Sequence, residues 1–252
     1  IIMFILSFLF FLTAILYSSV GFGGGSTYLA LLLIMNVPYQ IFPIIALCCN
    51  IIVVSGNCFN YIRAGNLNIK LLIPYLIGSI PLAFLGGSLL LDKKVFEIIL
   101  FSVLSLAGCL LIINHKSYDD KKKSYRDIPH IFSIFIGGII GFISGIVGIG
   151  GGIFLSPVLF LLKVARPKHI ITTASIFILI NSISGVIGHL TKNFIVIEIQ
   201  NYIYLFIAVF IGGQIGNYLN LKIFSSKLLA LVTAGLVLFV ALRMSLKIFI
   251  PF

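Results

Sequence analysis

The chain has 252 residues, of which 60% are hydrophobic and only 9% are charged, and its mean hydropathy is +1.23. Soluble domains carry about 25% charged residues, so this composition excludes an ordinary soluble protein. The formal net charge of +11 does not indicate nucleic-acid binding, because the basic residues lie in short loops between apolar segments.

The apolar segments predict membrane-spanning helices in two similar halves, since a run of about twenty residues crosses a hydrocarbon layer about 30 Å thick. The first half predicts helices over 2–19, 26–35, 41–62, 69–91 and 95–113, with a glycine string at 21–25. The second half predicts helices over 129–147, 153–163, 169–190, 195–221 and 227–249, with a glycine string at 148–152. We therefore expect membrane repeats over 1–113 and 129–252, joined by a polar linker over 114–128.

The two halves are related by an internal duplication. The string Gly21-Phe22-Gly23-Gly24-Gly25 matches Gly148-Ile149-Gly150-Gly151-Gly152, and further along each half Ser55-Gly56 matches Ser184-Gly185. The short helix after each string has about ten residues and, at 1.5 Å per residue, reaches only halfway through the hydrocarbon. If each half-helix turns back, each half crosses the membrane an odd number of times and the second half is inverted.

The distribution of basic residues favours this inverted arrangement. With half-helices that turn back, twelve of the seventeen Lys and Arg residues share one side, whereas the alternative divides them ten to seven. Because cytoplasmic loops are rich in Lys and Arg, the linker is predicted to be cytoplasmic and both termini outside. The sequence thus predicts an all-α polytopic protein of the cell's inner (plasma) membrane. It consists of two inverted repeats, each with a glycine-broken half-helix and about four longer helices.

The glycine strings suit an anion-binding site. Glycines that interrupt a helix leave backbone N–H groups without partners at the start of the next helix, where the helix dipole adds partial positive charge and attracts anions. Broken helices at matching places in inverted halves are typical of a transporter's midplane site. We therefore expect Ser26 to cap the first half-helix or to contact the ligand. The glycines expected to bind substrate are Gly21, Gly23, Gly24, Gly25, Gly148, Gly150, Gly151 and Gly152. By contrast, the small-residue spacing of Gly137, Gly141 and Gly145 predicts helix packing only.

The helix after each half-helix carries polar residues along one face, at i, i+3, i+4 and i+7 spacing. Neutral amides and hydroxyls suit an oxyanion that must bind and then leave. Interhelical hydrogen bonds, each worth about 0.6 kcal/mol, explain these side chains equally well. Thr173 and Ser175, which lie near the basic loop of Arg166, Lys168 and His169, would line a cytoplasmic vestibule that concentrates anions. The alternative is that this loop only fixes the topology. The polar residues expected to bind substrate are Asn50, Asn57, Thr173, Ser175, Asn181 and Ser184.

No enzyme motif is present: the sequence lacks paired carboxylates, H-E-x-x-H, a nucleophile elbow and a phosphate loop. We therefore expect no catalytic residues, no metal and no cofactor, and the expected partners are a small anion and the lipid bilayer, with no nucleic acid. A scaffold without transport would need no inverted pair of half-helices. A carrier of thiosulfate that relays sulfur through Cys48 or Cys49 is a further alternative.

The paired G-x-G-G-G strings, the Thr-Ala-Ser stretch over 173–175 and the Ser184-Gly185 step resemble the TauE/SafE sulfite exporter family over both halves of the chain. The resemblance implies a substrate among sulfite, sulfonates, thiosulfate and related organosulfur anions. One departure is Leu82, where the matching position in the second half is Gly216.

Energetics favour export as the direction. An inside-negative potential of 100 mV favours the exit of one negative charge by about 2.3 kcal/mol, so export of an anion needs no coupling. Uptake of thiosulfate or an organosulfonate would need a proton or another co-ion, and proton-coupled carriers usually hold acidic residues or His within the membrane. Here Asp92, Glu97 and Glu198 lie near helix ends.

Overall fold

The computed structural model describes residues 2–35, 37–114, 125–192 and 202–220, together with residues 235, 238, 242 and 245. All regular elements among these residues are helical, which confirms the predicted all-α fold. In chain order they are α1 (Ile2–Ser18), α2 (Gly25–Ile34), the 3-10 turn η1 (Tyr39–Ile41), α3 (Phe42–Arg63), α4 (Ile69–Ser88), α5 (Lys93–Asn114), α6 (His130–Val147), α7 (Gly152–Leu162), α8 (Pro167–Leu190) and α9 (Ile203–Asn220).

Helix boundaries follow local signals in the sequence. Asn68 caps α4, since its side-chain oxygen accepts a hydrogen bond from the backbone N–H of Leu71 at 3.2 Å. Pro167 occupies the first turn of α8, where a missing N–H costs nothing. Gly148 ends α6 in the left-handed conformation, with φ of 90°.

Within the described residues, four stretches are long and apolar enough to cross a membrane: Tyr39–Arg63, Ile69–Ser88, His130–Val147 and Pro167–Leu190. The half-helices are confirmed in length, because α2 has 10 residues and α7 has 11, about 15 Å of rise each. The predicted helix over 195–221 begins only at Ile203, and residues 193–201 lie outside the described part of the chain, as does most of the predicted helix over 227–249.

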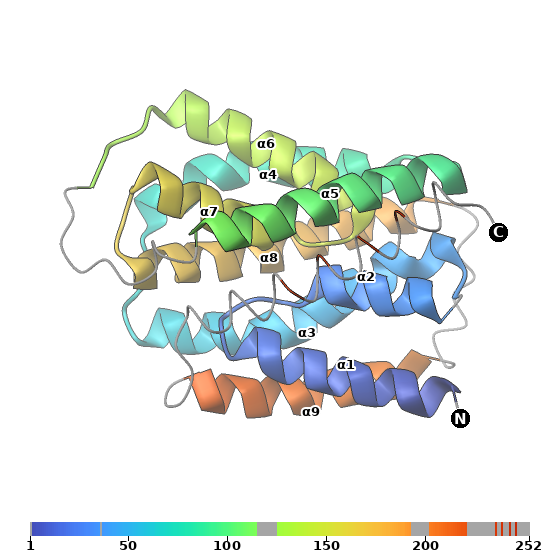
Figure 1. Ribbon diagram of the computed structural model, residues 1–252. Coiled ribbons are helices and arrows are strands. Elements are labelled where there is room, and N and C mark those ends of the chain that lie inside the picture. The colour runs from blue at the N-terminus through green and yellow to red at the C-terminus, as the bar shows by residue number, and fades with distance from the viewer. Residues whose placement is uncertain are drawn as a thin grey trace.

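The long helices form a bundle with α3 and α8 in contact at its centre (Figure 1). The most extensive packing joins α4 to α6, and the next joins α1 to α9. Glycines permit the close α4–α6 approach: a Cβ at Gly141 would lie 2.6 Å from Cα of Ser79, and one at Gly137 would lie 2.8 Å from Cα of Tyr75. This confirms the predicted packing role of the α6 glycines.

The departure at Leu82 is accommodated by a glycine on the neighbouring helix. A Cβ at Gly138 would lie 2.8 Å from Cδ1 of Leu82, so the absence of a side chain on α6 leaves the space that the larger α4 side chain fills. The exchange of a small residue for leucine therefore keeps the two helices packed.

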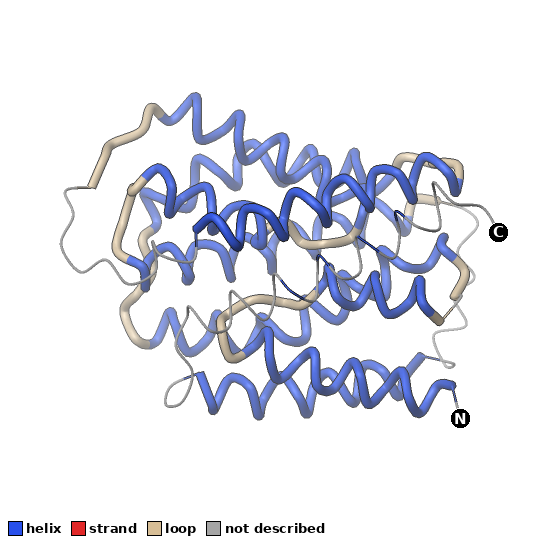
Figure 2. The backbone as a smooth tube through the Cα atoms, viewed as in Figure 1, coloured by secondary structure: helices blue, strands red, loops and turns tan. Residues whose placement is uncertain are grey.

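The two glycine strings lie midway between the ends of the bundle, whereas the other loops of the described residues lie near its ends (Figure 2). In Figure 1, α1 begins at the right-hand end, beside the N-terminus, and α6 begins at the left-hand end. After each glycine string the half-helix returns toward the end from which its long helix came. The inverted repeat, which requires this geometry, stays a prediction, as does the side of the membrane on which each end lies.

Candidate functional site

The glycine strings form two loops that start the half-helices without a side-chain cap. We call residues 19–24 glycine loop 1 and residues 148–151 glycine loop 2. The residues that precede the half-helices are Gly24 and Gly151, with φ of 88° and 80°, and neither helix start receives a side-chain hydrogen bond. The expectation that Ser26 caps α2 is therefore wrong, and its contact with a ligand stays a prediction. The Ser26 hydroxyl lies 3.4 Å from the hydroxyl of Tyr17.

Bare backbone N–H groups remain at both helix starts. In α2 the first amides that find an acceptor are those of Thr27 and Tyr28, which donate to Gly24 O at 3.0 Å each. In α7 the corresponding amides are those of Phe154 and Leu155, which donate to Gly151 O. No described residue accepts a hydrogen bond from the amides just before them, so each helix presents partial positive charge to the centre of the bundle.

Asn50 of α3 joins the two loops. Its Nδ2 donates a hydrogen bond to Ile149 O of glycine loop 2 at 3.0 Å, and its side chain is completely buried. A Cβ at Gly25 would lie 2.7 Å from the same Nδ2, and a Cβ at Gly150 would lie 2.9 Å from it. The amide of Asn50 therefore lies between the start of α2 and glycine loop 2, and we call this place the glycine centre.

Each loop is held by a helix from the other half of the chain. Asn50 of α3 bonds to glycine loop 2, and Ser175 of α8 donates from its hydroxyl to Gly21 O of glycine loop 1 at 2.5 Å. The packing contacts are exchanged in the same way, because Gly148 packs on Pro43 of α3 and Gly21 packs on Ile171 of α8. The two loops are thus fixed relative to both halves at once.

The surroundings of the two half-helix starts differ in polarity. Beside Gly25 lies the amide of Asn50, whereas Gly152, the equivalent position in α7, packs against the side chain of Ile178. Asn50 lies on α3 and Ile178 on α8, the long helices that follow the two half-helices. The sequence predicted two equivalent anion-binding helix starts, but the structure gives the start of α2 a polar neighbour and the start of α7 an apolar one.

Sequence reasoning missed two serines beside the glycine centre. A Cβ at Gly150 would lie 2.9 Å from Oγ of Ser182, and a Cβ at Gly151 would lie 3.4 Å from Cβ of Ser144. Both side chains are buried, and no described residue is a hydrogen-bond partner of either hydroxyl or of Asn50 Oδ1. Buried polar atoms without partners are uncommon in proteins. Ser182 lies one turn after Ile178 on α8, a spacing that only the contact of Ile178 with loop 2 makes informative.

The other predicted polar residues make contacts elsewhere. Ser184 donates to Ile80 O of α4 at 2.7 Å, which is an interhelical hydrogen bond, and Asn181 donates to Phe177 O of its own helix. Asn57 lies two turns after Asn50 on α3, and its Oδ1 lies 3.3 Å from the hydroxyl of Ser18. Thr173 is fully buried on α8, and none of the described residues pairs with its hydroxyl.

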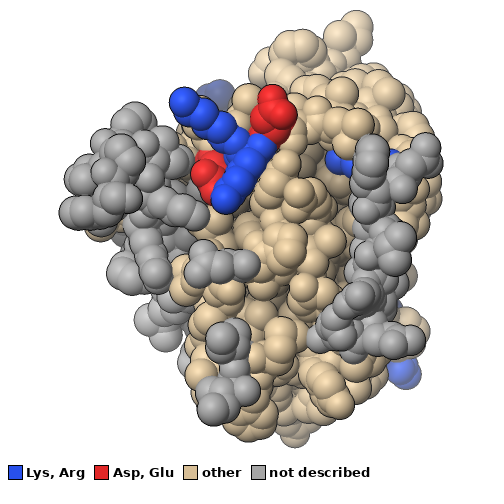
Figure 3. All heavy atoms as spheres, turned by 90° about the vertical axis from the view of Figure 1, so that its right-hand side faces the viewer, with Lys and Arg blue, Asp and Glu red and all other residues tan. Residues whose placement is uncertain are grey.

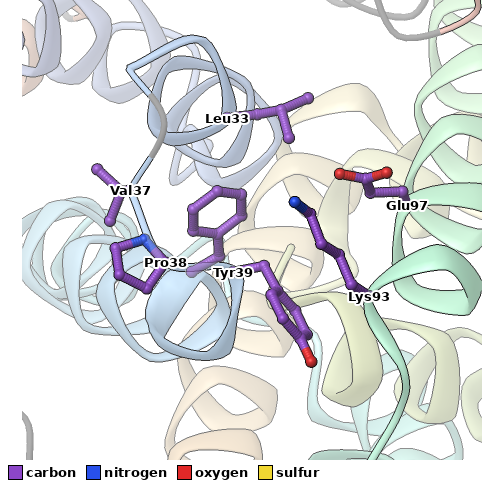
Figure 4. A pocket seen from close by; sticks show the side chains of 7 residues that line it. Leu33, Val37, Pro38, Tyr39, Lys93 and Glu97 are labelled. Carbon is purple, nitrogen blue, oxygen red and sulfur yellow. The ribbon is translucent and has the colours of Figure 1, made fainter. Parts of the chain in front are cut away.

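The loops are closed to both ends of the bundle, since every residue from Val20 to Gly25 and from Gly148 to Gly152 is buried. A pocket of about 210 Å³ lies beside the C-terminal end of α2 and the start of α5. Figure 4 shows the amino group of Lys93 and the carboxylate of Glu97 turned into this space. The pocket is lined by Leu33, Val37, Pro38, Tyr39, Phe42, Lys93 and Glu97.

This end of the bundle carries few charges, and Figure 3 shows acidic and basic side chains gathered in one area of a largely uncharged surface. At the end of α8, Nε2 of His189 donates to Gly145 O at 2.8 Å, and Nζ of Lys192 lies 3.1 Å from Nδ1 of the same ring. Burial lowers the pKa of Lys192 from 10.5 to about 8. The half-buried Lys192 therefore lies directly after the C-terminal end of α8.

No group of three potential metal ligands occurs among the described residues. The cysteines that the sulfur-relay alternative requires lie on α3, where Cys49 is buried and Cys48 is partly buried, and both are free thiols.

Comparison with known proteins identifies the family. Residues 6–244 match the family model described as "Sulfite exporter TauE/SafE". The chain is 27% identical to the probable membrane transporter protein y4hK of Sinorhizobium fredii, over 95% of this chain and 96% of that protein. It is 24% identical to the probable membrane transporter protein YunE of Bacillus subtilis, over 88% of this chain and 89% of that protein. It is also 30% identical to the probable membrane transporter protein MJ0441 of Methanocaldococcus jannaschii, over 59% of this chain and 53% of that protein. No solved structure matches the chain.

Proposed function

The chain belongs to the TauE/SafE sulfite exporter family of membrane transporters, and we propose that it exports a small sulfur-containing anion, such as sulfite or an organosulfonate, bound at the glycine centre. As a member of this family it is an integral membrane transporter and not an enzyme.

One observation carries the proposal: the start of α2, with its bare amides, lies beside the amide of Asn50 in a buried, neutral environment. Backbone N–H groups at a helix start and a side-chain amide bind oxyanions without a full opposing charge. Neutral donors make binding weak enough for release, which a carrier requires. The apolar side chain of Ile178 beside the centre would contact the organic substituent of a sulfonate.

The unpaired polar atoms around the centre favour an oxyanion that carries one proton. Asn50 Oδ1 can only accept a hydrogen bond, so the hydroxyl of hydrogen sulfite would satisfy it, while the other oxygens accept from Ser182 and from the start of α2. A fully deprotonated anion offers no donor to this atom. The site thus fits a monoanion better than a dianion.

Export follows from the charge of the substrate and from the predicted orientation. A monoanion leaving a cell with an inside-negative potential of 100 mV gains about 2.3 kcal/mol. The predicted cytoplasmic side carries Arg63, Lys70, Arg166 and Lys168, which would concentrate anions at that end of the bundle. We therefore propose the inner membrane as the location, with the linker in the cytoplasm and both termini outside.

The test is efflux of ³⁵S-labelled sulfite from proteoliposomes at a set membrane potential. We expect the wild-type rate to increase with an inside-negative potential and to be independent of an imposed pH gradient. Asn50→Leu removes the donor and is expected to reduce efflux at least tenfold. Efflux that follows the proton gradient would favour the alternative, a proton-coupled importer of thiosulfate or an organosulfonate. Equal efflux from Asn50→Leu would refute the site.

The chemical class of the substrate is tested by thermal stabilisation in detergent with sulfite, sulfate, thiosulfate, taurine and sulfoacetate. A ligand that binds only the folded protein raises its unfolding temperature as concentration exceeds the dissociation constant. We expect hydrogen sulfite, or a sulfonate whose organic part carries a donor such as the ammonium of taurine, to stabilise more than sulfate, which has no proton to donate at neutral pH. A larger shift with sulfate would contradict the monoanion preference.

A further inference from the structure

A second polar cluster lies between α1, α3 and α9, away from the glycine centre. Ser18, at the end of α1, donates from its hydroxyl to Gly213 O of α9 at 2.7 Å and lies 3.3 Å from Oδ1 of Asn57. Beside Asn57, a Cβ at Gly56 would lie 3.1 Å from Nδ2 of Asn217. We call this group the amide cluster; its members are Ser18, Gly56, Asn57, Gln214 and Asn217.

The cluster brings side-chain amides from two helices to one place. The Nε2 atom of Gln214 would lie 3.5 Å from a Cβ at Gly56, so this glycine leaves the space into which both α9 amides extend. Asn217 is only 8% exposed, and Asn57 is not exposed at all. Two buried amides, those of Asn57 and Asn217, and the exposed amide of Gln214 therefore lie around Gly56, and their N–H groups can donate to an anion.

Asn57 has an unused donor in this cluster. Its Oδ1 lies 3.3 Å from the Ser18 hydroxyl, whose single proton is donated to Gly213 O at 2.7 Å, and no described residue accepts a hydrogen bond from Nδ2. A residue whose role is to join helices would be expected to pair both ends of its amide, because a buried unpaired donor costs stability. The buried, unpaired donor instead indicates a ligand that is present only part of the time.

The cluster lies between the glycine centre and the basic end of the bundle. Asn57 follows Asn50 by seven residues on α3, which is about 10.5 Å along the same helix face. Arg63 ends that helix six residues later. An anion that moves from the basic end to the glycine centre along this face of α3 passes the amide cluster.

We infer that the amide cluster is a second oxyanion-binding site, at which the transported anion pauses between the basic end of the bundle and the glycine centre. The inference rests on the proposed transport of an anion. Neutral amide donors bind the anion weakly, so the second site lowers the barrier without holding the substrate. Its occupant is the same monoanion that binds at the glycine centre.

The experiment uses the full chain in proteoliposomes with ³⁵S-labelled sulfite, and compares wild type, Asn57→Leu and Asn217→Leu. At sulfite concentrations far below KM, we expect each variant to reduce flux at least tenfold. The unfolding temperature of Asn57→Leu should equal or exceed that of wild type, since the substitution removes a buried unpaired donor. The thermal shift produced by sulfite should persist, because the glycine centre is unchanged. Ser102→Ala is the matched control, as this hydroxyl on α5 bonds only to Ile98 O of its own helix.

The outcomes separate this inference from the function on which it rests. Unchanged flux in both variants, with transport by wild type, would overturn the second site and leave the glycine centre intact. A lower unfolding temperature together with a proportional loss of flux would show that Asn57 only joins helices; Asn217→Leu gives an independent reading if Asn57→Leu does not fold. If wild type neither transports sulfite nor is stabilised by it, the proposed function fails and the second site with it.

Discussion

Gly150→Ala provides the sharpest test of the glycine centre. The backbone of Gly150 has a φ of 82°, a left-handed conformation that costs a residue with a Cβ about 1–2 kcal/mol. The new methyl group would also lie 2.9 Å from Asn50 Nδ2, Ile178 Cγ2 and Ser182 Oγ. Overpacking of a dense interior adds about 1–3 kcal/mol. We therefore expect a total destabilisation of about 2–5 kcal/mol.

Gly65→Ala is a matched control for the backbone contribution. Gly65 has a φ of 71°, and a Cβ at this position meets nothing within 4 Å. This variant should show only the conformational cost of about 1–2 kcal/mol. The difference between the two variants then isolates the contacts of the methyl group with Asn50, Ile178 and Ser182.

The assays are chemical unfolding in detergent and sulfite flux in proteoliposomes, with flux normalised to folded protein. The Gly150 methyl group would occupy the space between Asn50 and Ser182, where we place the anion, so we expect normalised flux to be lost. Gly65→Ala should retain full flux. Equal destabilisation in the two variants would refute the packing argument, and normal flux through folded Gly150→Ala would refute the proposed site.

Three further outcomes follow from other contacts. Ser175→Ala leaves Gly21 O without its donor and should cost about 1–3 kcal/mol in chemical unfolding, with reduced flux. The pKa of Lys192 is about 8 in the folded protein and 10.5 in the unfolded chain, so the unfolded chain binds more protons between pH 8 and pH 10.5. The unfolding temperature of wild type should therefore rise across this pH range. Lys192→Gln should remove that rise. Replacing Cys48 and Cys49 together by Ser should leave sulfite and thiosulfate flux intact, whereas a sulfur relay would lose the thiosulfate flux.

Each of these expectations can fail in a specific way. If Ser175→Ala is as stable as Ser102→Ala, the bond to glycine loop 1 contributes nothing to the fold. If Lys192→Gln retains the pH dependence of wild type, another group titrates in that range. Loss of thiosulfate flux alone in the double cysteine variant would point to sulfur chemistry in α3.

The sequence predicted the elements that depend on local patterns. Apolar length located most helices within a few residues, and the shortness of α2 and α7 was evident because the glycine strings mark where each begins. Small-residue spacing identified the face of α6 that packs closely on another helix, since a glycine acts through the space that it leaves. These features need no knowledge of the neighbouring helix.

Tertiary contacts decided the parts that the sequence left open. Ser184 and Asn50 are both polar residues on core helices, and only the structure shows that one bonds to α4 while the other bonds to a glycine loop. Ser182 gave no signal because its neighbour is the backbone of Gly150, which belongs to a separate element earlier in the chain. Helix periodicity assigns a residue to a face, but it does not say which element that face meets.

The difference between the side chains around the two glycine loops matters more for transport than the similarity of the loop backbones. Matching strings build two similar backbones, in which Gly24 packs on Thr13 and Gly151 packs on Ile140, and the duplication aligns these two pairs with each other. If the side chains around them matched as well, an anion would meet two equal sites and would have to leave one to enter the other. The start of α2 has Asn50 as its neighbour, whereas the start of α7 has Ile178. The duplicated backbone therefore offers one polar helix start. The bonds that cross from each half to the loop of the other then hold that single site together, so a rocking motion of the halves must carry the site along or break the bond between Asn50 and Ile149.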